Sequence, residues 1–130
     1  RLRHPIETLS FVLNREDVIQ LQEAIKDIYI SPAVKKYVIG IMRATREHKD
    51  IYLGGSPRAS LALYRAGQSF AAMQGRDFVL PDDIKYLAEY IICHRLVIDP
   101  SARLRNISAQ LIVNEILRSQ PIPTGDLELN

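Results

Sequence analysis

Residues 54–60 read GGSPRAS, which predicts the start of a helix and places an arginine in its first turn. Ser56 suits the N-cap, because its hydroxyl can accept a hydrogen bond from a free amide of that turn. Pro57 suits the first helical position and pushes Ser56 toward the extended backbone that an N-cap needs. Arg58 then lies beside the positive end of the helix dipole, at an adverse cost of roughly 0.3–1 kcal/mol. A bound phosphate would reverse that sign, since amides, dipole and guanidinium would all face it.

The helix that begins at Pro57 is expected to run to about Gln74. Gly75 suits the position just beyond its end, where a left-handed backbone is common. Apolar residues lie around most of the circumference of this helix, which is typical of a helix buried inside a bundle. Two amphipathic segments before it, at about 15–28 and 32–48, predict two further helices. We therefore expect the helix from Pro57 to be the central one.

After the central helix, Pro81 opens a fourth helix whose first turn carries the negative charges of Asp82 and Asp83. Residues 96–105 predict either a small hairpin or an irregular loop. A last helix follows over about 109–120. The predicted side-chain N-caps are Asn14, Ser31, Ser56 and Ser108. The fold class expected is an all-α bundle of four or five helices, with room for one short β-hairpin.

The composition is that of an ordinary globular domain. The chain has 130 residues, of which 47% are hydrophobic and 25% charged, and a net charge of +2. That charge is too small to predict binding to nucleic acid or to an acidic membrane. Cys93 has no partner for a disulfide, and no apolar run approaches the roughly 18–20 residues that span a bilayer. We expect a cytoplasmic protein and, because the first residue is Arg, a piece cut from a longer one.

Six spaced segments together resemble one known family. They read RATREH at 43–48, GGSPRASLAL at 54–63, GRDFV at 75–79, PDDI at 81–84, HRL at 94–96 and PIP at 121–123. The chain is similar in these segments to the C-terminal helical lid of the MoxR-family AAA+ ATPases. The resemblance implies three parts. Residues 1–13 are a segment that leads in from a preceding ATPase core, residues 14–120 are the lid domain, and residues 121–130 are a C-terminal tail.

In the MoxR family the arginine of the Ser-Pro-Arg motif is the sensor-2 residue, which reaches the γ-phosphate of ATP held in a separate α/β domain. The resemblance implies this role for Arg58, on the helix that Ser56 and Pro57 start. Gly55 departs from the family, which more often has alanine there. We expect that difference to change chain flexibility and not charge.

The resemblance also implies what the longer protein does. It would use ATP, with Mg²⁺ held by the ATPase core, in a ring that is a homo-hexamer with a chaperone-like remodelling activity. Proteins with von Willebrand factor A domains are typical partners of the family. The sequence in hand lacks both the phosphate loop pattern Gly-x4-Gly-Lys-Ser/Thr and a strand ending in metal-binding acids. This chain alone is therefore expected to be inactive.

Arg43 and Arg46 share one face of the second helix and could extend a basic patch toward the nucleotide. The alternative is a solvated helix face on which they pair with Glu47 and Asp50. Two rival functions also stay open: a helical nucleic-acid-binding module, and a protein-interaction bundle without nucleotide dependence. The scarcity of aromatic residues among the basic ones disfavours nucleic acid. We expect neither nucleic acid nor a membrane span.

Overall fold

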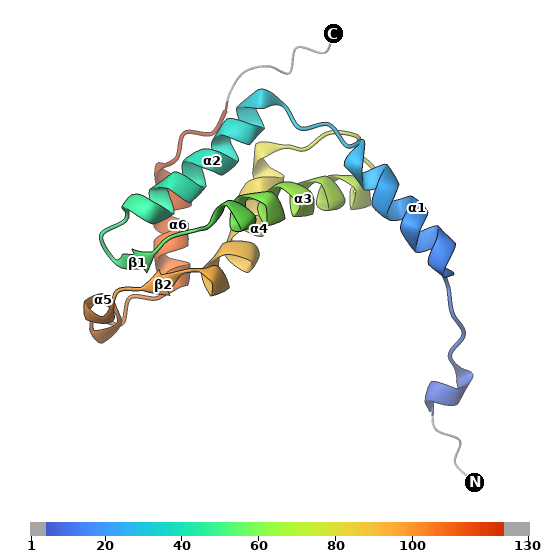
Figure 1. Cartoon of the computed structure of the whole chain (residues 1–130), viewed down its shortest axis with the longest axis horizontal. Helices are drawn as coiled ribbons and strands as arrows, with labels where there is room; N and C mark the ends of the chain where they lie inside the picture. Colours follow the sequence, from blue (N-terminus) through green and yellow to red (C-terminus); the bar gives the residue numbers. More distant parts are fainter. Residues whose placement is uncertain (1–4, 124–130) are drawn as a thin grey trace.

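The computed structural model describes residues 5–123, and these form a helical bundle with one very short sheet (Figure 1). The outer parts of the predicted leading segment and tail, residues 1–4 and 124–130, lie outside the described residues. The elements are η1 (Pro5–Thr8), α1 (Arg15–Lys26), α2 (Pro32–Glu47), β1 (Ile51–Leu53), α3 (Pro57–Met73), α4 (Pro81–Ile92), η2 (Cys93–Arg95), β2 (Val97–Ile98), α5 (Pro100–Leu104) and α6 (Ala109–Ser119).

The predicted fold class is confirmed, and the small sheet is present. Its second strand, β2, lies where a hairpin was expected, but its antiparallel partner is β1, about 45 residues earlier, with Ile51 opposite Ile98. Residues 100–104 form the short helix α5 instead of a second hairpin strand. Asp99 starts α5 by accepting a hydrogen bond from the amide of Ser101 at 2.8 Å.

All four predicted N-caps are formed. The side chains of Asn14, Ser31, Ser56 and Ser108 accept hydrogen bonds from the amides of Asp17, Val34, Ala59 and Leu111. Gly75 ends α3 with a φ of 72°, and the amide of Arg76 donates back to the carbonyl of Ala71 at 2.9 Å. This is the Schellman arrangement, in which a left-handed glycine closes the last turn.

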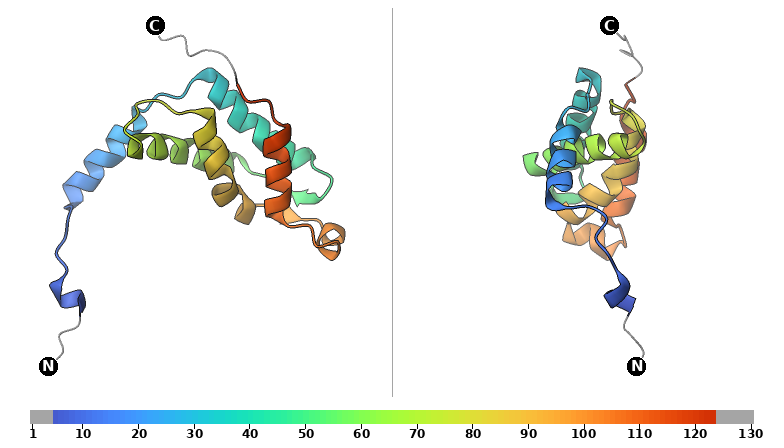
Figure 2. Two further views of the ribbon diagram at one scale, coloured as in Figure 1. Left: turned by 180° about the vertical axis from the view of Figure 1, so that it is seen from behind. Right: turned by 90° about the vertical axis from the view of Figure 1, so that its right-hand side faces the viewer.

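Helix α3 lies at the centre and contacts α1, α2 and α4 (Figures 1 and 2). The core beneath it is aliphatic, and its fully buried large side chains include Ile41, Met42, Leu63, Ile84, Ile92 and Ile112. The prediction of a central helix is confirmed, but α3 is not enclosed on all sides. Leu61 and Met73 keep 56% and 80% of their surface exposed.

None of the residues of α1 is buried. Polar contacts at its C-terminal end join this helix to the bundle. The side-chain amide of Gln68, itself buried on α3, donates to the carbonyl of Ile28 at 2.8 Å and to that of Lys26 at 3.3 Å. Next to it, Tyr29 exchanges backbone hydrogen bonds with the extended segment around Phe78. The end of α1 is thus held by α3 and by the segment that follows it.

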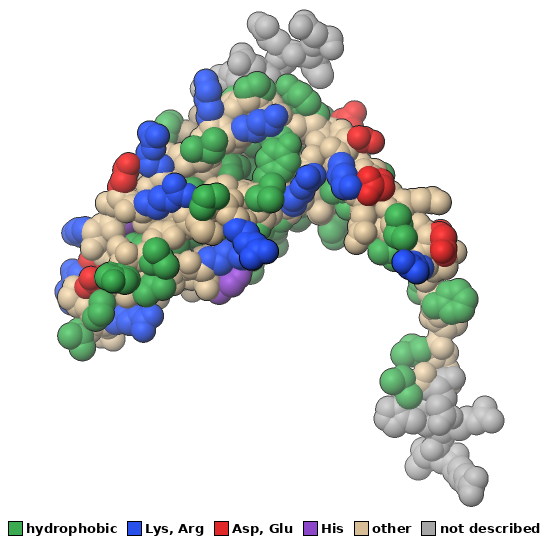
Figure 3. Space-filling model, in the orientation of Figure 1, with side chains coloured by type: hydrophobic (Ala, Val, Ile, Leu, Met, Phe, Trp, Pro, Cys, Tyr) green, Lys and Arg blue, Asp and Glu red, His purple; other side chains and the backbone are tan. Residues whose placement is uncertain are grey.

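The segment before α1 leads away from the bundle in every view (Figures 1 and 2). Leu9, Phe11 and Val12 have 77%, 87% and 93% of their surface exposed. Apolar side chains along this arm are visible in the space-filling view (Figure 3). Such a run of exposed apolar residues is typical of a surface that another domain covers. Docking to a preceding domain stays a prediction.

Candidate functional site

Arg58 lies in the first turn of α3 with its side chain exposed. Among residues 5–123 it has no hydrogen-bond or ion-pair partner for its guanidinium. No carboxylate of the described chain neutralises it, so its charge is available to a ligand from outside. The structure therefore leaves this arginine unpaired at a helix end where its own charge is unfavourable.

The first turn of α3 offers one free backbone donor beside that side chain. Pro57 has no N–H, and the amide of Ala59 donates to the carbonyl of Ser56 at 2.9 Å and to its hydroxyl at 3.3 Å. The amide of Ser60 bonds the carbonyl of Ser56. Within the described residues the amide of Arg58 has no acceptor. A phosphate oxygen there would thus meet one amide and one guanidinium of the same residue, fewer amides than the sequence argument assumed.

The two glycines before Ser56 lie directly against the end of α2. The amide of Gly55 donates to the buried hydroxyl of Thr45 at 2.8 Å, and the Nε–H of Arg46 donates to the carbonyl of Gly55 at 2.7 Å. The Thr45 hydroxyl in turn donates to the carbonyl of Met42 at 2.7 Å. Both polar atoms of the Gly55 backbone are therefore bound by neighbouring side chains of α2.

A side chain would meet helix backbone at Gly54, but only the end of a flexible side chain at Gly55. A Cβ on Gly54 would come within 2.6 Å of the Cα of Arg46, which is helix backbone. A Cβ on Gly55 would come within 2.6 Å of the sulfur of Met42. Neither glycine has a positive φ; among the described glycines only Gly75 does. The expectation that Gly55 changes chain flexibility stays a prediction.

Arg43 and Arg46 lie on the same face of α2, as their spacing predicted, and both are exposed. Arg43 has no hydrogen-bond or ion-pair partner within residues 5–123. Arg46 uses only its Nε–H, on Gly55, and leaves its terminal NH groups unpaired in that same part of the chain. The alternative pairing does not form, because the carboxylate of Asp50 binds Arg105 instead. A role of either arginine at the nucleotide stays a prediction.

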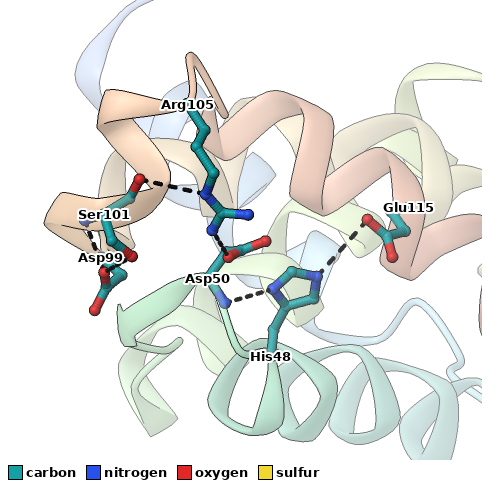
Figure 4. A network of polar contacts seen from close by, with 6 residues as sticks. All are labelled: His48, Asp50, Asp99, Ser101, Arg105 and Glu115. Carbon is teal, nitrogen blue, oxygen red and sulfur yellow. Dashed lines mark hydrogen bonds and ion pairs between the residues drawn. The ribbon is translucent and has the colours of Figure 1, made fainter.

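A polar network that the sequence did not reveal holds the end of α2 to α5 and α6 (Figure 4). The Nδ1 of His48 accepts the amide of Asp50 at 3.2 Å, and its Nε2 lies 3.7 Å from the carboxylate of Glu115. The buried carboxylate of Asp50 accepts from Arg105 at 2.5 Å. These contacts join residues up to 67 positions apart (48 to 115), so no local pattern signals them.

Arg76 pairs with the start of α4. Its guanidinium donates two hydrogen bonds to the carboxylate of Asp83, at 2.7 and 2.8 Å. The same carboxylate accepts the amide of Leu80 at 2.8 Å, which ties the residue before α4 to the first turn of that helix. The hydrogen bond to Asp83 raises the pKa of Arg76, and burial acts against it. The pair fixes the turn between α3 and α4.

Other site classes find no support in residues 5–123. No three His, Cys, Asp or Glu side chains gather there as a metal site would require, and no helix there is long and apolar enough to cross a bilayer. In the face shown by Figure 3, Lys and Arg side chains are scattered among apolar and acidic ones. They form no continuous basic stripe on that face, of the kind that follows a nucleic-acid backbone.

Comparison with known proteins places this geometry in a family. The AAA lid domain family matches residues 43–116. The uncharacterized protein YeaC of Bacillus subtilis is 42% identical over 92% of this chain and 38% of its own length. Chaperone MoxR1 of Mycobacterium tuberculosis is 31% identical over 86% of this chain and 32% of its own length.

A solved structure agrees with these relatives. The crystal structure of a possible ATPase from Cytophaga hutchinsonii superimposes with a TM-score of 0.83 and 31% identity, over 91% of this chain and 40% of that one. The chain thus spans less than half the length of each protein it is compared with. The matched region contains the end of α2, the Gly-Gly turn, the start of α3 and the Asp83 pair. The chain belongs to the AAA lid domain family, and over most of its length it is similar to part of the chaperone MoxR1.

Proposed function

We propose that this domain is a nucleotide-responsive lid, in which Arg58 acts as the sensor-2 residue toward the γ-phosphate of ATP. One observation carries the proposal: an exposed arginine, unpaired within residues 5–123, stands beside its own free amide at the start of the central helix. Both groups suit a phosphate oxygen, and an anion there would turn an unfavourable helix charge into a favourable one.

The proposed mechanism is a contact that differs between two states. ATP bound in the α/β core would supply the terminal phosphate, and core residues would hold Mg²⁺, since the described part of the lid has no acidic cluster for it. With that phosphate present, Arg58 holds the lid closed; without it, the lid is free to turn. A charge-assisted pair of this kind contributes about 1.5–3 kcal/mol, or roughly 10- to 150-fold in population.

For the longer protein we propose ATP hydrolysis in a homo-hexameric ring with a chaperone-like remodelling role in the cytoplasm. Support comes from the relative named as a chaperone, and from the uncovered apolar arm before α1, which suits a covering ATPase core. Proteins with von Willebrand factor A domains are the partners we propose to test first. The lid alone is expected to hydrolyse no ATP, because phosphoryl transfer also needs a phosphate loop, a metal and a positioned water.

The test uses the full-length protein with Arg58→Ala and Arg58→Lys. We expect Arg58→Ala to lower ATP turnover at least about 10-fold while leaving helix content unchanged, because the side chain is exposed and has no partner among the described residues. Arg58→Lys should recover part of the loss, since lysine keeps the charge without the planar fork. Arg103→Ala, another exposed arginine without a described partner, is the matched control. Turnover of Arg58→Ala equal to that of the control would refute the sensor assignment.

A further inference from the structure

The start of α3 carries three exposed residues in a row, Ser56, Pro57 and Arg58. The nearest buried positions are Gly55 before it and Ala59 after it. Arg58 is therefore held through Gly55 on one side and through the buried Ala59 of α3 on the other, and the Gly55 side is a turn and not helix backbone.

Two side chains of α2 fix that backbone. Thr45 accepts the amide of Gly55, and Arg46 donates to its carbonyl, so the peptide units on both sides of the Gly55 Cα are tied to one helix. Thr45 is fully buried and its hydroxyl is itself oriented by the carbonyl of Met42. The missing side chain of Gly54 lets the turn lie against the backbone of Arg46 without a gap. These two hydrogen bonds and the close contact at Gly54, which we call the grip on Gly55, leave the turn little freedom to shift.

We propose that Thr45 and Arg46 are positioning residues for Arg58, setting where the first turn of α3 presents its guanidinium and amide. This inference rests on the proposed function of Arg58 and adds a role for α2 in it. Only Ser56 and Pro57 lie between Gly55 and Arg58, so a shift of the turn moves the arginine with it. A displacement of about 1 Å at a reacting group can cost roughly 100-fold in rate.

Arg46 offers a test that separates positioning from a direct contact with phosphate. Glutamine carries its side-chain NH₂ at the same distance along the chain as the Nε of arginine, but has no charge. Lysine keeps the charge but has a methylene at that point, with its donors one bond further out. Positioning through Gly55 thus requires the donor, which glutamine retains, whereas a phosphate contact requires the charge, which lysine retains.

The measurement is kcat and KM for ATP in the full-length protein carrying Arg46→Ala, Arg46→Gln or Arg46→Lys. We expect Arg46→Ala and Arg46→Lys to lower kcat by roughly 10- to 100-fold, and Arg46→Gln to recover most of the loss. Recovery by Arg46→Lys but not by Arg46→Gln would overturn the inference in favour of a direct charge contact. Lys36→Ala, an exposed cation at the other end of α2, is the control for loss of charge.

Thr45 provides the matched pair on the other side of Gly55. Thr45→Ser keeps the acceptor and should retain turnover, whereas Thr45→Val removes it at nearly the same volume and should behave like Arg46→Ala. Should Thr45→Val fold poorly, Arg46, which is exposed, still decides the question. Equal turnover of the Arg46→Ala protein and the wild type would overturn the inference.

Two further measurements separate this inference from the function on which it rests. In the background of Arg58→Ala, the Arg46→Ala change should cost no further turnover, because its effect passes through Arg58. Hydrogen exchange of the bonded amides of Gly55, Ala59 and Ser60 should quicken in Arg46→Ala whatever the role of Arg58. Unchanged hydrogen exchange at these amides would refute the proposed hold of Arg46 on Gly55. Wild-type ATP turnover in Arg58→Ala would refute only the sensor function.

Discussion

Removing the carboxylate of Asp83 should destabilise the domain far more than removing its neighbour Asp82. The Asp83 side chain is 6% exposed and accepts two hydrogen bonds from Arg76 and one from the amide of Leu80. Asp82 is exposed and makes no hydrogen bond or ion pair within the described residues. The two acids sit side by side in the first turn of α4, so they share the same interaction with the helix dipole.

The expected cost of Asp83→Ala follows from those contacts. The bidentate pair contributes about 1.5–3 kcal/mol and the hydrogen bond from the Leu80 amide about 1 kcal/mol. Because the Arg76 side chain is 23% exposed, water compensates part of the loss. The sum is about 2–4 kcal/mol for Asp83→Ala, against at most about 1 kcal/mol for Asp82→Ala.

Urea unfolding of the 130-residue chain, followed by circular dichroism, measures both variants. For a chain of this size a loss of 1 kcal/mol lowers Tm by about 3–5 °C, so Asp83→Ala should melt roughly 6–20 °C lower. A cycle with Arg76→Ala should show a coupling of at least about 1 kcal/mol between the two residues. Free energies for Asp83→Ala and Asp82→Ala within about 0.5 kcal/mol of each other would refute the reasoning.

Two other changes follow from the site geometry. Gly54→Ala should lower the free energy of unfolding by about 2–3 kcal/mol, because its Cβ meets helix backbone. Gly55→Ala should lower it by less than about 1.5 kcal/mol, because the Met42 side chain can turn aside. Equal losses in urea unfolding would contradict the packing explanation. Hydrogen bonds from Ser101, first from its hydroxyl and then from its amide, hold the pKa of Asp99 below its ordinary 3.8. The stabilisation that Asp99 provides is therefore present above pH 3.8 and is lost as the pH falls through the lowered pKa. The gap in urea midpoint between wild type and Asp99→Ala should therefore shrink below about pH 3.8, and a gap that stays constant down to about pH 2 would argue against it.

The sequence was a good guide wherever the determining contacts are local. Helix starts at Ser31, Ser56 and Ser108 were predicted because an N-cap acts on an amide three residues away. Gly75 was predicted for the same reason, since the backbone bond that closes its turn joins residues five positions apart.

The remainder depends on contacts between distant residues. The partner of β2 lies across three elements, and the bond from Gln68 to Ile28 spans 40 positions, so neither leaves a pattern in a short window. The candidate site divides in the same way. Arg58 was identified from its place after Ser56 and Pro57, whereas the grip of Thr45 and Arg46 on Gly55 became visible only once α2 and the turn were brought together.

The pairing of a free amide with a free guanidinium on one residue has an evolutionary consequence. A substitution at position 58 would remove the side-chain donor but keep the backbone N–H. Any replacement other than proline would therefore weaken the contact with an anion without abolishing it. A lineage could therefore retune its response to nucleotide in small steps. Only proline at position 58, next to Pro57, would remove the side-chain donor and the backbone N–H together.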